Sequence, residues 1–219
     1  MAPQDVGRRE STVRTIQALG VVAVIRMKDA GKLRAVIDAI AEGGVRAIEV
    51  TMSVPGAVGL IAQLAPVLPS SILFGAGTVT DAATARAVID AGARFIVSPV
   101  FRREVIDACH ERDIVVAPGC FSPTEILDAH DYGADVVKVF PATALGPSYI
   151  KDIRAPLPQV RLMPTGGVTL DNAGDWIRAG AIAVGVGSAL LDTRAIEEGR
   201  LEVLTDNARR IVASVASAR

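Results

Sequence analysis

Short runs rich in valine, isoleucine and alanine recur along this chain and alternate with amphipathic helical segments. Eight such runs predict β-strands: VVAVIR from Val21, AIEVTM from Ala47, LFGAGT from Leu73, FIVSP from Phe95, IVVAPG from Ile114, VVKVFP from Val136, RLMPTGG from Arg161 and AVGVGS from Ala183. Strands and helices that alternate over 219 residues indicate an α/β protein, a single (β/α)8 TIM barrel with an N-terminal helix. A doubly wound open sheet is the alternative.

The barrel domain is expected to span residues 12–219. Residues 1–11 are polar and charged and lack a periodic apolar pattern, so a flexible N-terminus is expected there.

A weak internal repeat is visible in the glycines that end every second helix. They are Gly44, Gly92, Gly133 and Gly180. Glycine suits the left-handed backbone just past a helix, because it has no Cβ to clash there. Five residues further on stand Glu49, Val97, Lys138 and Gly185. Since alternate strands of a barrel share one interior layer, we expect Glu49 and Lys138 to face each other inside it.

Charge and composition exclude several classes of partner. The formal net charge is −1, with both signs spread along the chain, so nucleic acid is not an expected partner. The chain has no apolar run of about 18 residues, which predicts no membrane span and a cytoplasmic location. Cys109 and Cys120 form neither a CxxC pair nor a disulfide framework and are expected to be free thiols.

Two ionisable residues stand inside predicted strands. Lys138 lies in VVKVFP and Glu49 in AIEVT, each between apolar neighbours. Burial can lower a lysine pKa from about 10.4 toward roughly 7–8, which frees the amine to attack a ketone. A structural ion pair, or a lysine reaching out from the strand end, is the alternative. A carboxyl beside such an amine can shuttle protons, so the pair predicts Schiff-base chemistry.

Glycine-rich sequences at two predicted strand ends indicate a phosphate site. PTGG (164–167) and GVGS (185–188) end the seventh and eighth strands, where such barrels often bind phosphate through backbone N–H groups. Ordinary tight turns are the alternative. Arg26 and Thr78 end the first and third strands and are expected at the same rim, where an arginine suits a carboxylate or phosphate.

No metal and no cofactor are expected. Cys109, His110 and His130 fall on predicted helices without HExxH or CxxC spacing, which favours packing or surface roles.

Seven motifs in chain order resemble one enzyme family, the 2-keto-3-deoxy-6-phosphogluconate/4-hydroxy-2-ketoglutarate aldolases. They are GGVRAIEVT, FGAGTVT, FIVSP, PG, VVKVFPA, PTGGV and VGVGSAL. The resemblance implies a metal-independent class I aldolase, a homotrimer of the Entner–Doudoroff route. It implies cleavage of a phosphorylated keto-deoxy sugar acid, 2-keto-3-deoxy-6-phosphogluconate, into pyruvate and glyceraldehyde 3-phosphate.

The resemblance also implies roles for individual residues. Lys138 would form the Schiff base, and Glu49 would be the general acid/base. The pyruvate end of the substrate would be lined by Thr78, Pro99 and Phe140. The rest of the substrate and its phosphate would be held by Thr165, Gly166, Gly167, Gly187 and Ser188.

One position departs from the family pattern. Many members have an arginine four residues after the catalytic glutamate, whereas this chain has Ser53 there. Arg26 is the cation expected to replace it. Thr165 favours the gluconate-derived substrate, because relatives that cleave the galactonate epimer tend to have valine there. The galactonate epimer and 4-hydroxy-2-ketoglutarate are alternative substrates, and a sugar-phosphate epimerase or a non-catalytic scaffold are alternative functions.

Overall fold

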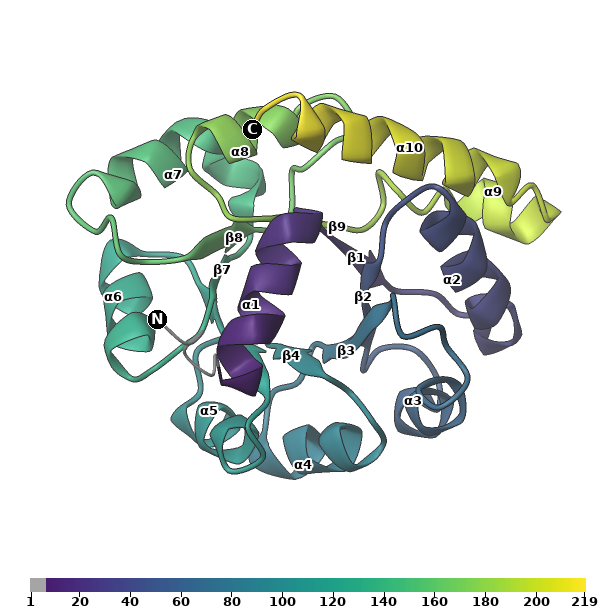
Figure 1. Ribbon diagram of the computed structural model, residues 1–219, viewed down its shortest axis with the longest axis horizontal. Coiled ribbons are helices and arrows are strands. Elements are labelled where there is room, and N and C mark those ends of the chain that lie inside the picture. The colour runs from purple at the N-terminus through teal and green to yellow at the C-terminus, as the bar shows by residue number, and fades with distance from the viewer. Residues whose placement is uncertain (1–6) are drawn as a thin grey trace, which may run out of the picture.

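The protein is an α/β structure whose strands lie at the centre and whose helices surround them (Figure 1). The structure is a computed structural model, and it describes residues 7–219. The strands of this range are β1 (Val21–Ile25), β2 (Ala47–Thr51), β3 (Leu73–Gly77), β4 (Phe95–Val97), β5 (Val115–Ala117), β6 (Gly119–Cys120), β7 (Val137–Val139), β8 (Leu162–Pro164) and β9 (Val184–Val186).

These strands form two sheets in which every pairing is parallel. The larger sheet has the order β5-β4-β3-β2-β1-β9, and the smaller has the order β6-β7-β8. The predicted fifth strand is divided at Pro118, which has no N–H to donate to a neighbouring strand. At the opposite edge of the smaller sheet, a single bridge joins Thr165, which follows β8, to Gly185 of β9 in the larger sheet. The expectation of one continuous eight-stranded barrel is therefore met only in part.

Apart from the first helix, the helices lie on the outer face of the strands (Figure 1). The helices of the described range are α1 (Arg8–Leu19), α2 (Leu33–Glu42), α3 (Ala57–Leu64), α4 (Ala82–Asp90), α5 (Arg103–His110), α6 (Pro123–Asp131), α7 (Gly146–Arg154), α8 (Ala173–Arg178), α9 (Thr193–Glu198) and α10 (Glu202–Ala216), with short 3-10 turns η1 (Ala30–Lys32) and η2 (Ala142–Ala144). The four repeated glycines have φ between +100° and +107°, as predicted. Within residues 7–219, none of the helices combines the length and the apolar character that crossing a bilayer requires.

Buried apolar side chains form two clusters, one on each side of the strands. The outer cluster lies between strands and helices and includes Ile48, Val50, Val137 and Val139. The inner cluster consists of Val13, Ile16, Val22, Ala47, Leu73, Phe95, Val97, Val115, Ala117, Val136, Met163 and Ala183. Because side chains alternate along a strand, Glu49 and Lys138 face the interior, as predicted.

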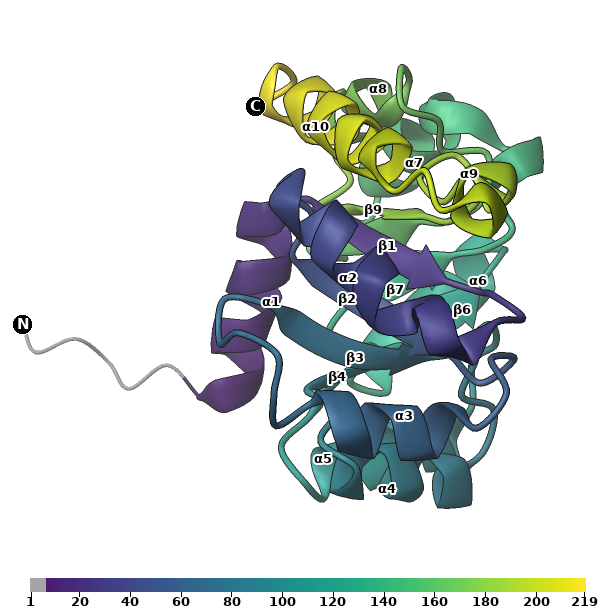
Figure 2. The same cartoon turned by 90° about the vertical axis from the view of Figure 1, so that its right-hand side faces the viewer.

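Helix α1 lies across the end of the molecule at which the strands begin (Figure 2). Its Val13 and Ile16 belong to the inner cluster and close that end with apolar side chains. The helix begins at Arg8, so residues 8–11 of the expected flexible N-terminus are helical in this structure. Residues 1–6 of that expectation lie outside the described residues.

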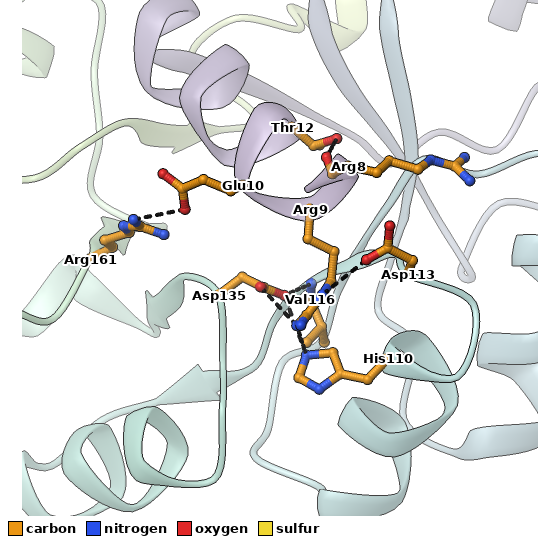
Figure 3. Close-up of polar contacts among 9 residues, drawn as sticks. All are labelled: Arg8, Arg9, Glu10, Thr12, His110, Asp113, Val116, Asp135 and Arg161. Atoms are coloured by element: carbon orange, nitrogen blue, oxygen red, sulfur yellow. Dashed lines mark hydrogen bonds and ion pairs between the residues drawn. The ribbon is translucent and has the colours of Figure 1, made fainter. Parts of the chain in front are cut away.

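Ion pairs hold α1 in this place (Figure 3). Arg9 Nη1 lies 3.1 Å from Asp135 Oδ1, and Arg9 Nε lies 3.3 Å from Asp113 Oδ1. On the other side of the helix, Arg161 Nη2 lies 2.9 Å from Glu10 Oε2. The Asp135 carboxylate is only 12% exposed, so its pairing with Arg9 is less screened by water than a surface pair.

Cys109, His110 and His130 lie on helices, as the sequence predicted. Cys109 and His110 lie at the end of α5, and His130 lies in α6. Cys109 and Cys120 are free and buried, and burial raises the pKa of each thiol to about 12. Both thiols therefore stay protonated and unreactive at neutral pH.

Candidate active site

Lys138 is a buried amine in the interior of the molecule. It lies in the middle of β7 and is 5% exposed. Its Nζ lies 4.8 Å from the centroid of the Phe140 ring. Burial lowers the pKa of Lys138, the Arg26 charge lowers it further, and the Glu49 charge opposes both. Since desolvation is the largest of these effects, more of the amine is neutral near pH 7 than for a lysine in water.

Glu49 is the buried carboxyl that interacts with this amine. It lies in the middle of β2, is 1% exposed, and has no hydrogen-bond partner for either carboxylate oxygen within residues 7–219. Burial raises the pKa of Glu49, while the charges of Lys138 and Arg26 lower it by smaller amounts. A carboxyl with a raised pKa can both hold and release a proton near neutral pH.

Two glycines leave room for the polar side chains of the interior. A Cβ added to Gly77 would lie 2.5 Å from Glu49 Oε1, and a Cβ added to Gly185 would overlap the hydroxyl of Thr165. Any larger residue at these two positions would displace Glu49 or Thr165. The Thr165 hydroxyl is buried and has no hydrogen-bond partner in the described range.

A cavity of about 360 Å³ lies beside Phe140. Six of the residues that the sequence singled out line it: Arg26, Phe140, Thr165, Gly166, Gly187 and Ser188. The lining also includes Val24, Leu191 and Thr193, which the sequence analysis missed. Leu191 and Thr193 come three and five residues after the GVGS motif, so their closeness to that motif in the sequence could have predicted that they line the site.

A second cavity, of about 470 Å³, adjoins the first. The two cavities share Arg26, Leu191 and Thr193. Ser53 and Lys28 line the second cavity only. Ser53, which stands where the family resemblance predicted an arginine, therefore borders this space, and Arg26 lines both cavities.

Five predicted residues line neither cavity: Lys138, Glu49, Thr78, Pro99 and Gly167. Thr78 follows β3 and has a left-handed backbone, with φ of 60°, which is a strained conformation for a threonine. The backbone of Pro99 lies against Gly119, the residue that pairs with Lys138. Gly167 is exposed, and its carbonyl accepts a hydrogen bond from Asn172 Nδ2.

Together these groups can support addition of an amine to a carbonyl. The site offers a desolvated amine, a carboxyl that exchanges protons, and the Arg26 guanidinium at the shared wall of the two cavities. In the part of the chain that the structure describes, no group of three or more His, Cys, Asp or Glu side chains is arranged to hold a metal ion.

Known proteins are similar to this chain in sequence and in fold. A family model described as KDPG and KHG aldolase matches residues 12–206. The chain is 34% identical over 197 residues to 2-dehydro-3-deoxy-phosphogluconate aldolase of Pseudoalteromonas atlantica, which covers 90% of this chain and 91% of that protein. It is 34% identical over 173 residues to 2-dehydro-3-deoxy-6-phosphogalactonate aldolase of Escherichia coli, covering 78% of this chain and 84% of that one.

A solved structure gives the same result. The KDPG aldolase of Legionella pneumophila, captured with pyruvate as a covalent carbinolamine intermediate, matches with a TM-score of 0.84 and 30% identity. The match covers 91% of this chain and 97% of that chain. The protein described here therefore belongs to the KDPG and KHG aldolase family and is a carbon–carbon lyase.

Proposed function

We propose that the protein is a class I aldolase that cleaves 2-keto-3-deoxy-6-phosphogluconate into pyruvate and glyceraldehyde 3-phosphate through a Schiff base on Lys138. The observation that carries the proposal is the buried pair in the interior. The pKa of Lys138 is lowered and that of Glu49 is raised, so burial favours the neutral amine and the protonated carboxyl. These are the protonation states with which imine formation begins.

In the proposed reaction, Glu49 moves the protons. The neutral Nζ of Lys138 adds to the C2 ketone, and Glu49 gives its proton to the departing hydroxyl, so that water leaves and an iminium forms. Glu49, now a carboxylate, takes the proton of the C4 hydroxyl. The C3–C4 bond then breaks, its electrons pass to the iminium as an enamine, and the aldehyde leaves. Protonation of C3 and hydrolysis release pyruvate and restore Lys138.

Binding of the substrate is assigned to the residues around the two cavities. Arg26 would hold the carboxylate, while the three-carbon end would lie against Thr78, Pro99 and Phe140. The phosphate and the chain that carries it would be held by Thr165, Gly166, Gly167, Gly187 and Ser188. The positive φ of Gly166 and Gly167, 91° and 73°, supports this assignment, because such turns direct backbone N–H groups toward an anion.

The gluconate-derived substrate is preferred in this proposal because of Thr165. Its buried hydroxyl has no partner in the described range and borders the cavity, where it can bond a substrate hydroxyl. Curated relatives include both phosphogluconate and phosphogalactonate aldolases. The galactonate epimer and 4-hydroxy-2-ketoglutarate are therefore the alternative substrates.

We also infer a closed (β/α)8 barrel, a homotrimer, a cytoplasmic location and a place in the Entner–Doudoroff route. The Thr165–Gly185 bridge and the 3.5 Å hydrogen bond from Val136 N, just before β7, to Val116 O of β5 support closure, because they link the two sheets on both sides. A structural neighbour, 30% identical, is a cage designed by fusing symmetric oligomeric domains, which supports an oligomer.

Trapping with borohydride tests the proposal. Pyruvate plus borohydride should leave a reduced adduct on Lys138, identified by peptide mass spectrometry, and Lys138→Ala should lose both the adduct and pyruvate release. Lys151→Ala, which removes an exposed lysine of α7, is the matched control and should keep both. An adduct on a different lysine would refute the assignment. Epimer formation by NMR without pyruvate release would favour the epimerase, and binding without turnover would favour the scaffold.

A further inference from the structure

The two sheets meet at a seam, where residues 115–118 lie beside residues 136–138. Val136 N donates to Val116 O at 3.5 Å, which is long for a hydrogen bond. Lys138 N donates to the carbonyl of residue 118 at 2.9 Å. Within residues 7–219, the backbone hydrogen bonds that cross the seam all run in this one direction, from the side of β7 to the side of β5.

The carboxylate of Asp135 supplies a hydrogen bond in the opposite direction. A regular parallel pair of strands has bonds in both directions, but Pro118 has no N–H with which to make one. Val116 N donates instead to Asp135 Oδ2, at 3.0 Å. Val116 is fully buried, and a buried N–H without a partner is costly. The Asp135 side chain therefore takes the place of a backbone acceptor at the seam.

Contacts with two helices fix the position of this carboxylate (Figure 3). Arg9 Nη1 of α1 donates to Asp135 Oδ1 at 3.1 Å, and the carboxylate is only 12% exposed. His110 Nε2, at the end of α5, lies 3.5 Å from Asp135 Oδ2 and also contacts Arg9 Nη1. The side chain of Asp135 thus joins α1, α5 and β5 to the segment that leads into β7.

The seam decides how the amine and the carboxyl of the site lie relative to each other, because they belong to different sheets. Lys138 lies in β7 of the smaller sheet, and Glu49 lies in β2 of the larger one. Lys138 comes three residues after Asp135, and its backbone N–H is itself part of the seam. A change in the distance between the start of β7 and β5 would therefore move Lys138 relative to Glu49.

We propose that Asp135 is a positioning residue, which holds the two sheets together at the seam through Val116 N and so keeps Lys138 in place opposite Glu49. Asp135 lines neither cavity, so it acts through β7 and not on the substrate. The inference rests on the proposed function, in which Lys138 and Glu49 act on the same substrate. The position of the acceptor oxygen should matter for the reaction more than its charge does.

Two substitutions of Asp135 separate the acceptor from the charge. Asp135→Ala removes both, so amide exchange at Val116, measured by NMR, should become about tenfold faster through loss of one hydrogen bond. The kcat and the rate of adduct formation on Lys138 at saturating pyruvate should each fall about tenfold, the cost of a shift of roughly half an ångström in a reacting group. Asp135→Asn keeps an oxygen for Val116 N and should restore all three values.

The KM should stay near the wild-type value in both variants, because the loops proposed to hold the phosphate follow β8 and β9. Arg9→Gln is the matched control for stability. It removes an ion pair of Asp135 and leaves the bond to Val116, so it should lower the unfolding temperature as Asp135→Asn does and keep kcat. If Asp135→Ala does not fold, Asp135→Glu replaces it: the charge stays, the longer side chain displaces the carboxylate, and kcat should fall.

The outcomes separate this inference from the proposed function. If folded Asp135→Ala, or Asp135→Glu in its place, keeps the wild-type kcat and adduct rate, the positioning role is refuted and the aldolase proposal stands. An equal loss of kcat in Asp135→Asn, or unchanged exchange at Val116 in Asp135→Ala, would also refute the positioning role. If the wild type releases no pyruvate and forms no adduct on Lys138, both proposals fail.

Discussion

Replacing Gly77 by alanine should lower the activity of this protein strongly and change its stability little. Gly77 ends β3, and its missing side chain leaves the space in which the Glu49 carboxyl lies. A Cβ there would lie 2.5 Å from Glu49 Oε1 and 2.7 Å from Glu49 Cδ. To reach an ordinary contact of about 3.4 Å, the carboxyl must move by roughly 0.7–0.9 Å.

The two consequences of that movement differ in size. A misplacement of about 1 Å in a reacting group costs on the order of 10²-fold in rate, so kcat should fall by about that factor. The free energy of unfolding should change by no more than about 1 kcal/mol, because Gly77 lacks a left-handed backbone and the displaced group is the end of a flexible side chain.

The assay is coupled pyruvate release, with chemical denaturation of the same preparations. Gly59→Ala is the matched control, because a Cβ at Gly59 of α3 has no neighbour within 4 Å. Gly59→Ala should keep the wild-type kcat, and its free energy of unfolding should rise by about 0.5–1 kcal/mol, since alanine is the better helix former. A folded Gly77→Ala enzyme with wild-type kcat would refute the assignment of proton transfer to Glu49 at its present position.

Two further predictions concern charge. In the wild type, the free energy of unfolding should rise with pH from the lowered pKa of Lys138 up to about 10.4, because the unfolded chain binds the extra proton in that window. Lys138→Met should abolish this rise in urea denaturation across alkaline pH, and an unchanged slope would contradict the buried placement of the amine. Arg9→Gln should cost about 1 kcal/mol through loss of its pairs with Asp135 and Asp113, whereas Arg86→Gln, which breaks an exposed pair, should cost less than about 0.5 kcal/mol. If both variants lose the same free energy of unfolding, the ion pairs of α1 stabilise the protein no more than an exposed pair does.

Local sequence patterns predicted the strands and the two ionisable interior residues. The strands β1 to β4 begin at Val21, Ala47, Leu73 and Phe95, as the apolar runs indicated. Lys138 and Glu49 could be placed in one interior layer because each stands five residues after a helix-ending glycine, and alternate strands of a barrel share a layer. These features depend on short, regular spacings, which a sequence displays directly.

Other features depend on contacts that no local pattern contains. The pairing of Arg9 with Asp135 joins residues 126 positions apart, and it helps to order the start of α1 that was expected to be flexible. The division of the fifth strand follows from Pro118, whose missing N–H matters only once its neighbours are known. The hydrogen bond from Thr51 Oγ1 to the carbonyl of Ile25 joins two neighbouring strands, so it becomes visible only in three dimensions.

Closure of one end by α1 has a consequence for the order of events in the proposed reaction. Val13 and Ile16 fill the far end, so ligands would approach the amine from the opposite end, where Phe140, whose ring centroid lies 4.8 Å from Lys138 Nζ, lines the first cavity. The departing aldehyde would then occupy the same passage that a water molecule needs to hydrolyse the remaining three-carbon unit. The aldehyde must therefore leave before water can reach the imine, so it should be released before pyruvate.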